Sequence, residues 1–402
     1  MFCLWAYRPD QFGIGRFVPV FVDALGAAGW QVDVLVPFPS YPTWRIDRSM
    51  PRHSFERDGA VRVTRYTPYV PRHHSALTRG LHELSLAGGV LRHLSRIARG
   101  ADLVIATAPP VLGSRVAARV ARSAGVPFVL LVYDLVSDLA TDVFPLGGSV
   151  ATVGLRRLEA ELLSRAAHVV ALSDEMTQRI ERFSGRKAQT SVIPIWADDE
   201  LLEGEPREAA LECRAKLGID GRRPLVGFSG SYARKQHLPA MVAALGEING
   251  EFTTVFVGDG LERERMEIAA ARSRGDVRVL GPLAGRELHG FLSACDLSIV
   301  PALTRHGGTG FPSKVANILA AGCPIVAISN NADTELARLL QQEQIGTVCP
   351  SLDSTALAAA IQAALALDGV EARRSRCRAY AARHLRKQDG IERFLSVVSD
   401  VC

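Results

Sequence analysis

The chain has 402 residues, 48% of them hydrophobic and 22% charged, with a formal net charge of +5. This length is too great for one compact core and predicts two domains of about 150–200 residues each. The seven cysteines form no close pair, which argues against a disulfide framework or a zinc site and favours a reducing compartment. We expect neither a signal peptide nor a membrane span, since no run approaches the roughly 18 apolar residues that a span needs.

The first half of the chain alternates short apolar runs with segments of helical periodicity. Residues 1–7 are typical of a strand, and helices are expected over residues 17–29 and 151–166. This alternation predicts a parallel sheet covered by helices. Further strands are predicted at residues 31–38, 61–67, 101–109, 127–134 and 168–173.

The pattern restarts after residues 191–208, which lose periodicity and gain acids and prolines. The fold class is therefore α/β, with two doubly wound domains joined near residue 195. Ligands of such sheets bind beyond the carboxyl ends of the strands, so the loops after the strands are the candidate sites, and two facing sheets would enclose a cleft. Strands of the second domain are predicted at residues 224–230, 253–260, 277–283, 297–303 and 324–329.

The first candidate loop is "YRPDQFGIGRF", residues 7–17. Gly13 and Gly15 would let backbone N–H groups approach an anion or a sugar at a helix N-terminus. A dinucleotide fingerprint is broken, because its third glycine is Val18 and no acid ends the next strand. A ligand-binding loop and a simple tight turn both remain open for this segment.

Two further loops of the first domain carry chemistry. In "PFPSYPTW", residues 37–44, Tyr41 and Trp44 could stack on a sugar or an apolar acceptor, or could form a hydrophobic lid. Asp134 and Asp138 follow a strongly apolar strand, where charged groups are candidates for a cleft. For Asp138 a helix cap is the alternative.

The second domain contains a phosphate-like loop, "GFSGSYARKQ", residues 227–236. Ser229, Gly230 and Ser231 follow a strand, and the cation Lys235 comes soon after. Small residues and a cation at a strand–helix junction suit a phosphate group. The segment is not a P-loop, because the required glycine-lysine pattern is absent.

The next two strands of this domain also end in small or extended segments. Gly258 in "FVGDG" permits a close approach of the backbone. Residues 280–283, "LGPL", end at Leu283 and could offer backbone groups to a flat base.

The segment "GTGFPSKVANILAAGCPIVA", residues 309–328, joins a glycine-rich turn to an apolar helix. Gly310 gives flexibility, Pro312 suits a first helical turn, and Ser313 and Lys314 offer a hydroxyl and a charge. With the partial positive charge of a helix N-terminus, these residues predict a phosphate site. A solvated lysine is the alternative.

Residues 71–100 contain five arginines, four histidines and one acid. Such a basic amphipathic helix can lie on an anionic membrane. A core-packing helix with a solvated basic face is the alternative. The apolar positions at helical spacing are Leu77, Leu81, Leu84, Leu91, Leu94 and Ala98.

The order of "FGIGRF", "PFPSYPTW", "GSYARKQ", "FVGDG" and "FPSKVANILAAGCPIVA" resembles the GT-B glycosyltransferases of family 4 over nearly the whole chain. Within the family it is most similar to the bacterial group that includes the colanic-acid fucosyltransferase and O-antigen N-acetyl-fucosaminyl transferases. The resemblance implies two Rossmann-like domains facing a central cleft. It also implies metal-independent, retaining transfer of a hexosyl group from a UDP- or GDP-linked donor, with no further cofactor and no nucleic acid. The acceptor would be a glycan or a polyprenyl-diphosphate-linked sugar in cell-surface polysaccharide or glycoconjugate biosynthesis.

The resemblance further implies that residues 1–195 bind the acceptor and residues 196–387 bind the donor. Residues 388–402 would return to the first domain. Together with the basic segment, it predicts a cytoplasmic protein that contacts the inner face of the membrane through residues 71–100.

Site roles follow from these motifs. Catalysis is expected of Asp134, Asp138, Lys235 and Lys314, and acceptor binding of Tyr41, Trp44 and Tyr133. Donor binding is expected of Gly13, Gly15, Ser229, Gly230, Ser231, Lys235, Gly258, Leu283, Gly310, Pro312, Ser313, Lys314 and Asn317.

The chain departs from the family pattern at several positions. Two glutamates usual around the last motif are Thr309 and Asn317 here, the second being the usual ribose ligand. An arginine usual beside the phosphate loop is Ser231, and a histidine usual after the fourth strand is Tyr133. Asn317 could bind a hydroxyl but adds no charge. The lost glutamates leave a non-catalytic protein that kept the fold as an alternative. A nicotinamide oxidoreductase is a further alternative, and the broken fingerprint and the missing ribose acid count against it.

Overall fold

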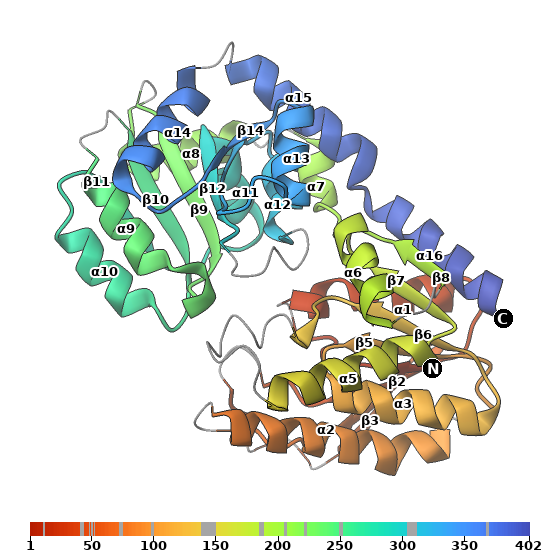
Figure 1. The fold of residues 1–402 in the computed structure, drawn as a ribbon. Helices are drawn as coiled ribbons and strands as arrows, with labels where there is room; N and C mark the ends of the chain where they lie inside the picture. The colour runs from red at the N-terminus through yellow and green to blue at the C-terminus, as the bar shows by residue number, and fades with distance from the viewer. Residues whose placement is uncertain are drawn as a thin grey trace. The chain divides into compact units, whose positions relative to one another are not determined.

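The structure, a computed structural model, describes the chain except residues 11–12, 41–43, 48, 50, 52, 72–74, 98–99, 138–149, 185–188, 205–206, 221–222, 249–251, 304–311 and 367–369. The side chains of a few other residues, Lys235 among them, are also outside the description. The chain divides into two compact units (Figure 1). Unit 1 comprises Met1–Pro194 and Gly390–Cys402, and unit 2 comprises Ile195–Asp389.

The described residues of unit 1 form an eight-stranded sheet in the order β3-β4-β2-β1-β5-β6-β7-β8. All neighbours are parallel except β3 and β4, which pair antiparallel. Every residue of β5 and β6 is buried, as expected for parallel strands covered on both faces. The strands are β1 (Phe2–Cys3), β2 (Val32–Pro37), β3 (His53–Asp58), β4 (Val61–Tyr66), β5 (Val104–Ala108), β6 (Phe128–Val132), β7 (His168–Ala171) and β8 (Gln189–Val192).

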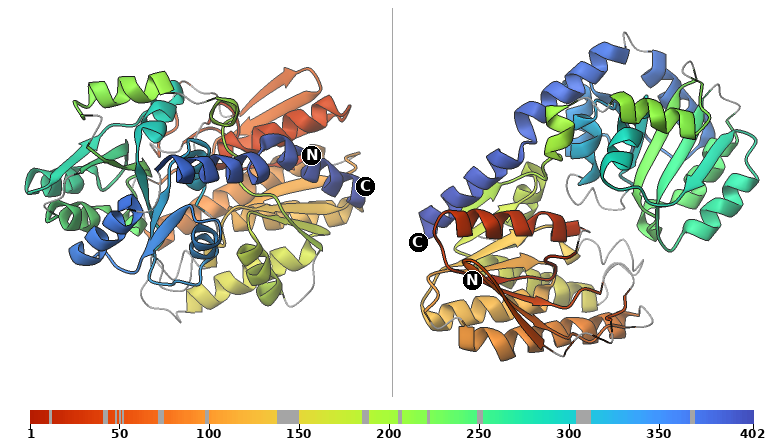
Figure 2. Two further views of the ribbon diagram at one scale, coloured as in Figure 1. Left: turned by 90° about the horizontal axis from the view of Figure 1, so that it is seen from above. Right: turned by 180° about the vertical axis from the view of Figure 1, so that it is seen from behind.

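Helices cover this sheet on both sides, with α2, α3 and α5 lined up on one face and α1 on the other (Figures 1 and 2). The last helix, α16 (Lys387–Val401), adds Phe394 to the core of unit 1, where its ring stacks on Phe21 at a centroid distance of 4.2 Å. The helices along the chain are η1 (Gly13–Arg16), α1 (Val18–Ala27), α2 (Ala76–Ile97), α3 (Val111–Ala124), α5 (Val150–Arg165) and α6 (Asp174–Ser184).

Unit 2 has a six-stranded parallel sheet in its described residues, ordered β11-β10-β9-β12-β13-β14. The chain order reverses between β9 and β12, and such a switch point is where doubly wound sheets bind ligands. The strands are β9 (Leu225–Ser231), β10 (Thr253–Asp259), β11 (Asp276–Leu280), β12 (Leu297–Pro301), β13 (Ile325–Ile328) and β14 (Gly346–Cys349). The helices are α7 (Asp199–Glu203), α8 (Arg207–Lys216), η2 (Arg234–Gln236), α9 (Leu238–Gly246), α10 (Arg263–Ala271), α11 (Gly285–Ala294), α12 (Lys314–Ala320), α13 (Glu335–Gln342), α14 (Ser354–Ala366) and α15 (Val370–His384).

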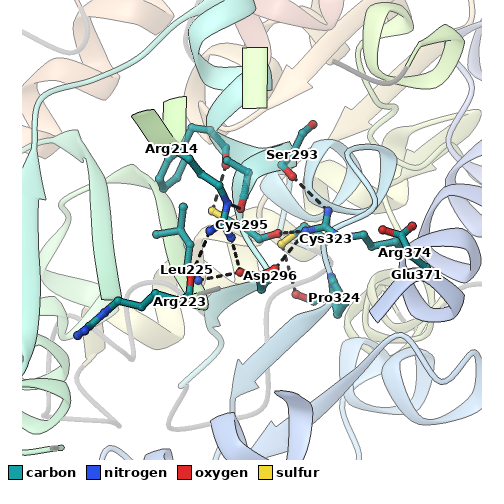
Figure 3. A network of polar contacts seen from close by, with 12 residues as sticks. Arg214, Arg223, Leu225, Ser293, Cys295, Asp296, Cys323, Pro324, Glu371 and Arg374 are labelled. Atoms are coloured by element: carbon teal, nitrogen blue, oxygen red, sulfur yellow. Dashed lines mark hydrogen bonds and ion pairs between the residues drawn. The ribbon is translucent and has the colours of Figure 1, made fainter. Parts of the chain in front are cut away.

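The amino edge of this sheet is held by a network around Asp296 (Figure 3). Its carboxylate accepts hydrogen bonds from Arg214 at 2.5 Å and from the N–H of Leu225 at 2.8 Å. Arg374 lies 3.5 Å from the same carboxylate and donates to the carbonyl of Cys295 at 2.8 Å. These charges compensate one another at the amino ends of the strands, so their role is structural. The ligand site of such a sheet is expected at the opposite, carboxyl edge.

The predicted strands are all present, and the part of the chain that the structure describes contains three strands that were not predicted. The strand β3 is missing from the prediction because its sequence is charged and exposed, as is typical of an edge strand. The short strands β8 and β14 lack a fully buried face. Within the described residues no single helix is long and apolar enough to cross a membrane; one bent pair, Ser354–Ala366 with Glu371–Val401, meets the criterion by length and composition only.

Candidate functional site

Two glycines lie side by side at the carboxyl edge of the unit 2 sheet. Gly230 at the end of β9 is in register with Gly258 of β10. Their φ angles are +139° and +156°, and a Cβ atom on Gly258 would lie 1.9 Å from the carbonyl oxygen of Gly230. Only glycine permits this backbone path. The result is an edge of bare backbone that another molecule can approach closely.

Lys314, the first residue of α12, brings a positive charge to this edge. Its Nζ atom lies 4.0 Å from the centroid of the fully buried Phe228 ring, a cation–π distance. The same Nζ would be 2.8 Å from a Cβ atom on Gly230. The structure therefore brings together Gly230, Gly258 and Lys314, three residues predicted separately from distant parts of the sequence.

Tyr232, which was not predicted, ties the ends of three strands together. Its N–H donates to the carbonyl of Asp259 at 2.7 Å, and its hydroxyl donates to the carbonyl of Leu280 at 2.9 Å. Burial raises the pKa of the Tyr232 hydroxyl, which keeps the group a neutral donor. Leu283, a predicted donor residue, is half-buried three positions beyond Leu280.

The loop after β9 borders a small cavity of about 280 Å³. Lys235 lies in η2 beside it, but its side chain is outside the description. The buried Glu262 accepts a hydrogen bond from Arg265 at 2.8 Å and lies 3.5 Å from Arg234. Both arginines are largely exposed, and the buried carboxylate of Glu262 is their shared ion-pair partner. The cavity is lined by Arg234, His237, Pro239, Ala240, Glu262 and Arg265.

The remaining predicted donor residues of unit 2 lie around the same edge. Ser229 is nearly buried within β9, whereas Ser231 is exposed at its end. Pro312 and Ser313 directly precede α12, half-buried and exposed respectively. Gly310 lies outside the described residues.

Asn317, predicted to bind the donor, has a different set of contacts. The main-chain N–H of Asp198 donates to its Oδ1 at 2.9 Å, and its Nδ2 donates to the Asp198 carboxylate at 2.8 Å. Both ends of the amide are therefore engaged by one residue. The structure gives this side chain a partner within the protein where the sequence predicted a nucleotide.

In unit 1 the loop after β1 turns at the two predicted glycines. Gly13 has a φ of +54° and opens η1. A Cβ atom on Gly15 would lie 2.8 Å from both the Cβ and the carbonyl oxygen of Asp10. Burial raises the pKa of Asp10, a residue that the sequence analysis did not single out. This tight packing accounts for a glycine at position 15 without a ligand.

Tyr133 and Asp134 follow β6 at the carboxyl edge of the unit 1 sheet, and both are half-buried. The N–H of Tyr133 donates to the carbonyl of Ala108 at 2.9 Å, and burial raises the pKa of its hydroxyl. The buried Glu159 of α5 holds the next residues, accepting from the N–H of Val136 at 2.7 Å and the hydroxyl of Ser137 at 2.5 Å. Glu159 was missed because its partners lie more than 20 positions away.

The aromatic loop of unit 1 is described only in part. Trp44 has a φ of +51° and meets the ring of His82 edge-on, with 5.7 Å between ring centroids. Tyr41 and Asp138 lie outside the described residues. Among the residues that are described, no three His, Cys, Asp or Glu side chains are grouped as a metal site requires.

Two family models match the chain, one in each half. Residues 12–196 match the model described as "Glycosyl transferase 4-like domain", and residues 223–366 match the one described as "Glycosyl transferases group 1". The chain belongs to the glycosyltransferases. The second match spans β9, β10 and α12, so the glycine edge and Lys314 lie within a glycosyltransferase domain.

Relatives of this glycosyltransferase agree with the assignment over most of its length. WcaI of Escherichia coli, named as a glycosyl transferase of colanic acid biosynthesis, is 26% identical over 399 residues, which is 97% of each chain. Sucrose-phosphate synthase from Thermosynechococcus elongatus superimposes with a TM-score of 0.74 at 20% identity, covering 99% of this chain and 98% of that one. HepE of Anabaena, solved with UDP-glucose, gives 0.71 at 18% identity, with both chains covered completely. The structural likenesses establish the GT-B fold, with its two Rossmann-like domains.

The family assignment changes the weight of the two alternatives. A nicotinamide oxidoreductase is not favoured, because both halves of the chain match glycosyltransferase models. A non-catalytic relative is not favoured either. For this glycosyltransferase, sequence reasoning missed Tyr232, Glu159 and Asp198, each of which acts through contacts that no local motif reveals.

Proposed function

We propose that this glycosyltransferase moves a hexosyl group from a UDP- or GDP-linked donor, and that unit 2 binds the donor diphosphate. The observation that carries the proposal is the ammonium group of Lys314, placed above Phe228 and close to Gly230. A diphosphate could approach the bare backbone at Gly230 and Gly258 and be neutralised by this cation. Lys235, five residues after Gly230, would add a second charge.

The proposed reaction retains the configuration of the sugar. The bond between the anomeric carbon and the diphosphate oxygen breaks, and an acceptor hydroxyl attacks from the same face. Its proton passes to the departing diphosphate oxygen. Because the acceptor attacks directly from that face, no protein nucleophile is required, and the charge that a metal ion would supply comes from lysine side chains. Lys314 and Lys235 would stabilise the negative charge that develops on the leaving group. Asp134 and Asp138 are proposed to orient the acceptor, with Tyr133, Tyr41 and Trp44 forming its apolar and aromatic surroundings.

The comparisons support the proposed class of donor and the proposed pathway. HepE, which shares the fold, was solved with UDP and with UDP-glucose, which supports a nucleotide-sugar donor. WcaI is named for colanic acid biosynthesis, which supports a role in cell-surface polysaccharide or glycoconjugate synthesis. A fucosyl-type sugar is proposed from the sequence resemblance alone.

A donor panel tests this proposal. Purified protein is incubated with UDP- and GDP-linked sugars, fucosyl donors included, and donor hydrolysis and glycan transfer are measured with and without EDTA. We expect turnover of one donor class, unchanged by EDTA, with the product anomer matching the donor by NMR. In parallel, thermal unfolding is followed with UDP, GDP, ADP and NAD. Stabilisation by NAD alone would overturn the proposal, and an inverted anomer would overturn the retaining mechanism.

We further propose that the acceptor is lipid-linked and that α2 contacts the inner face of the membrane. His82, Leu86 and Leu94 of α2 are buried, so the core side of this helix is occupied. Of the five leucines predicted from periodicity, Leu94 is on this core side, and the other four, at positions 77, 81, 84 and 91, lie on the outer side, each at least 45% exposed. An exposed leucine row with neighbouring arginines suits an anionic membrane.

Vesicle flotation tests the membrane proposal. The variant Leu81→Glu/Leu84→Glu should lose co-flotation with vesicles that contain anionic lipid, whereas Leu211→Glu should keep it. Leu211 is a matched control because it is 69% exposed on α8 of unit 2. Absence of co-flotation of the wild type, or equal flotation of both variants, would contradict the proposal.

A further inference from the structure

The two polar residues of α12 lie three positions apart on one side of a helix that is otherwise buried. Val315, Ala316 and Ile318 are fully buried in unit 2, while Lys314 and Asn317 are half-buried. Residues three apart on a helix are neighbours. Because both residues belong to α12, contacts that hold the Asn317 side chain also restrict the position of Lys314.

Asn317 is fixed by two hydrogen bonds to Asp198, a residue 119 positions earlier in the chain. The N–H of Asp198 can only donate, so the amide oxygen must face it, and the amide nitrogen must face the carboxylate. Paired contacts to a charged group are among the stronger hydrogen bonds in proteins. This geometry leaves one orientation of the Asn317 amide.

The segment that carries Asp198 is itself anchored at several points of unit 2. Nε2 of His289 on α11 lies 3.0 Å from the Asp198 carboxylate, and its Nδ1 lies 3.2 Å from that of Glu200. The N–H of Ala197 donates to the carbonyl of Leu385 at 2.9 Å, and Lys387 pairs with Asp199. The start of unit 2 is thereby joined to α11, to α12, and to the end of unit 2 at Leu385 and at the first residue of α16.

From these contacts we propose that Asn317 is a positioning residue, paired with Asp198, that holds α12 so that Lys314 stays above Phe228 and beside Gly230. This inference rests on the proposed function, in which Lys314 neutralises the donor diphosphate. It replaces donor binding as the role of Asn317, because the amide faces Asp198. Asn317 then acts on transfer through Lys314 and makes no contact with the donor.

Exchange of the two side chains tests the pairing. Asn317→Asp places two carboxylates against each other and should lower kcat by about tenfold or more, the size expected when hydrogen bonds to a charged group are lost. Asp198→Asn alone should also lower kcat. In the double variant Asp198→Asn/Asn317→Asp, the new amide donates to the new carboxylate, and the N–H of residue 198 keeps its acceptor. Nε2 of His289, which lies 3.0 Å from the same oxygen of Asp198, then accepts the second hydrogen of the new amide in its Nδ1–H tautomer. The double variant should recover most of the turnover, with KM for the donor near the wild-type value.

A role in ribose binding gives different results. Donor affinity would then fall with every change at position 317, and the double variant would recover nothing. Discrimination between nucleotide diphosphates with ribose and with deoxyribose would also be lost, whereas a positioning residue leaves that ratio unchanged. Either result would overturn the inference. Glu247→Gln, which removes one exposed carboxylate at the end of α9, is the control for the change of charge.

Thermal unfolding separates this inference from the proposed function. The Tm should fall in Asn317→Asp and recover in the double variant, whether or not a donor is turned over. If the wild type transfers no sugar and the Tm still recovers, the proposed function fails and the pairing stands. If Tm does not recover in the double variant, the pairing fails.

Discussion

The candidate site is built from single residues whose roles are set by contacts with residues far away in the sequence. Lys314 is a lone cation in the sequence, and only the fold puts it next to Phe228 and Gly230, more than 80 positions earlier. The strand-end rule could predict that Gly230 and Gly258 share an edge, because it depends on topology alone. It could not predict that the Asn317 amide turns to Asp198, because no local pattern encodes a contact 119 positions away.

Removing the charge of Lys314 should stop transfer and leave the fold intact. Lys314→Met keeps an unbranched apolar chain over Phe228, so the Tm should change little. Loss of one group that stabilises developing charge lowers kcat by about 100- to 1,000-fold. Turnover and Tm are measured beside Lys216→Met, an exposed lysine on α8 that lies 3.7 Å from Glu287. Turnover of Lys314→Met close to that of the control would refute the role of Lys314.

At the scale of elements, helix α2 shows what periodicity can and cannot predict. The spacing of its apolar residues predicts a helix. The spacing alone does not tell which side of that helix packs against the core. The structure buries His82, Leu86 and Leu94 and exposes Leu77 and Leu84. The charged strand β3 was missed because its sequence has no buried apolar face that marks a strand. It is a strand because it pairs with β4.

Two adjacent glycines of α2 make a matched pair of variants. A Cβ atom on Gly89 would lie 2.1 Å from the Tyr66 ring, whereas one on Gly88 meets nothing within 4 Å. Gly89→Ala should lower the free energy of unfolding by about 1–3 kcal/mol through overpacking. Gly88→Ala should raise it by up to about 1 kcal/mol, because alanine favours helix. Urea unfolding measures both, and equal effects of the two substitutions would contradict this packing.

Glu83 links α2 to α3 and should give stability a dependence on pH. Its carboxylate accepts from the N–H of Leu112 at 3.1 Å, and burial raises its pKa above the ordinary value. The folded state thus holds a proton that the unfolded state loses above about pH 4.3. The free energy of unfolding should fall as pH rises from there through the folded pKa. Glu83→Gln should show a smaller fall over this window in urea unfolding at a series of pH values; an unchanged slope would contradict the assignment.

At the scale of the whole molecule, the two-domain α/β class follows from the chain length and the repeated strand–helix pattern. The placement of the last helix does not follow from that pattern, because periodicity cannot say which sheet a terminal helix covers. The structure assigns Gly390–Cys402 to unit 1. Phe394 shows why: it is fully buried, between Phe21 at 4.2 Å and Phe2 at 6.3 Å.

Truncating the Phe394 side chain should destabilise unit 1 more than unit 2. Phe394→Ala should cost about 3–5 kcal/mol of unfolding free energy, the range for a buried phenylalanine. Hydrogen exchange with mass spectrometry should show faster exchange in peptides of unit 1. Phe291→Ala, which truncates a buried ring on α11 of unit 2, should show the reverse distribution. Faster exchange of unit 2 peptides in Phe394→Ala would contradict the assignment of α16.

The discontinuity of unit 1 sets the order in which the ribosome can deliver its parts. Residues 1–194 emerge first, yet their core lacks Phe394 until the whole of unit 2 has been made. Unit 2 is continuous and can complete its folding earlier in synthesis. The surface around Phe2 and Phe21 is thus uncovered for the time needed to translate about 195 residues, roughly 10–40 s at 5–20 residues per second. Nascent chains stalled before residue 390 should consequently bind chaperones through unit 1.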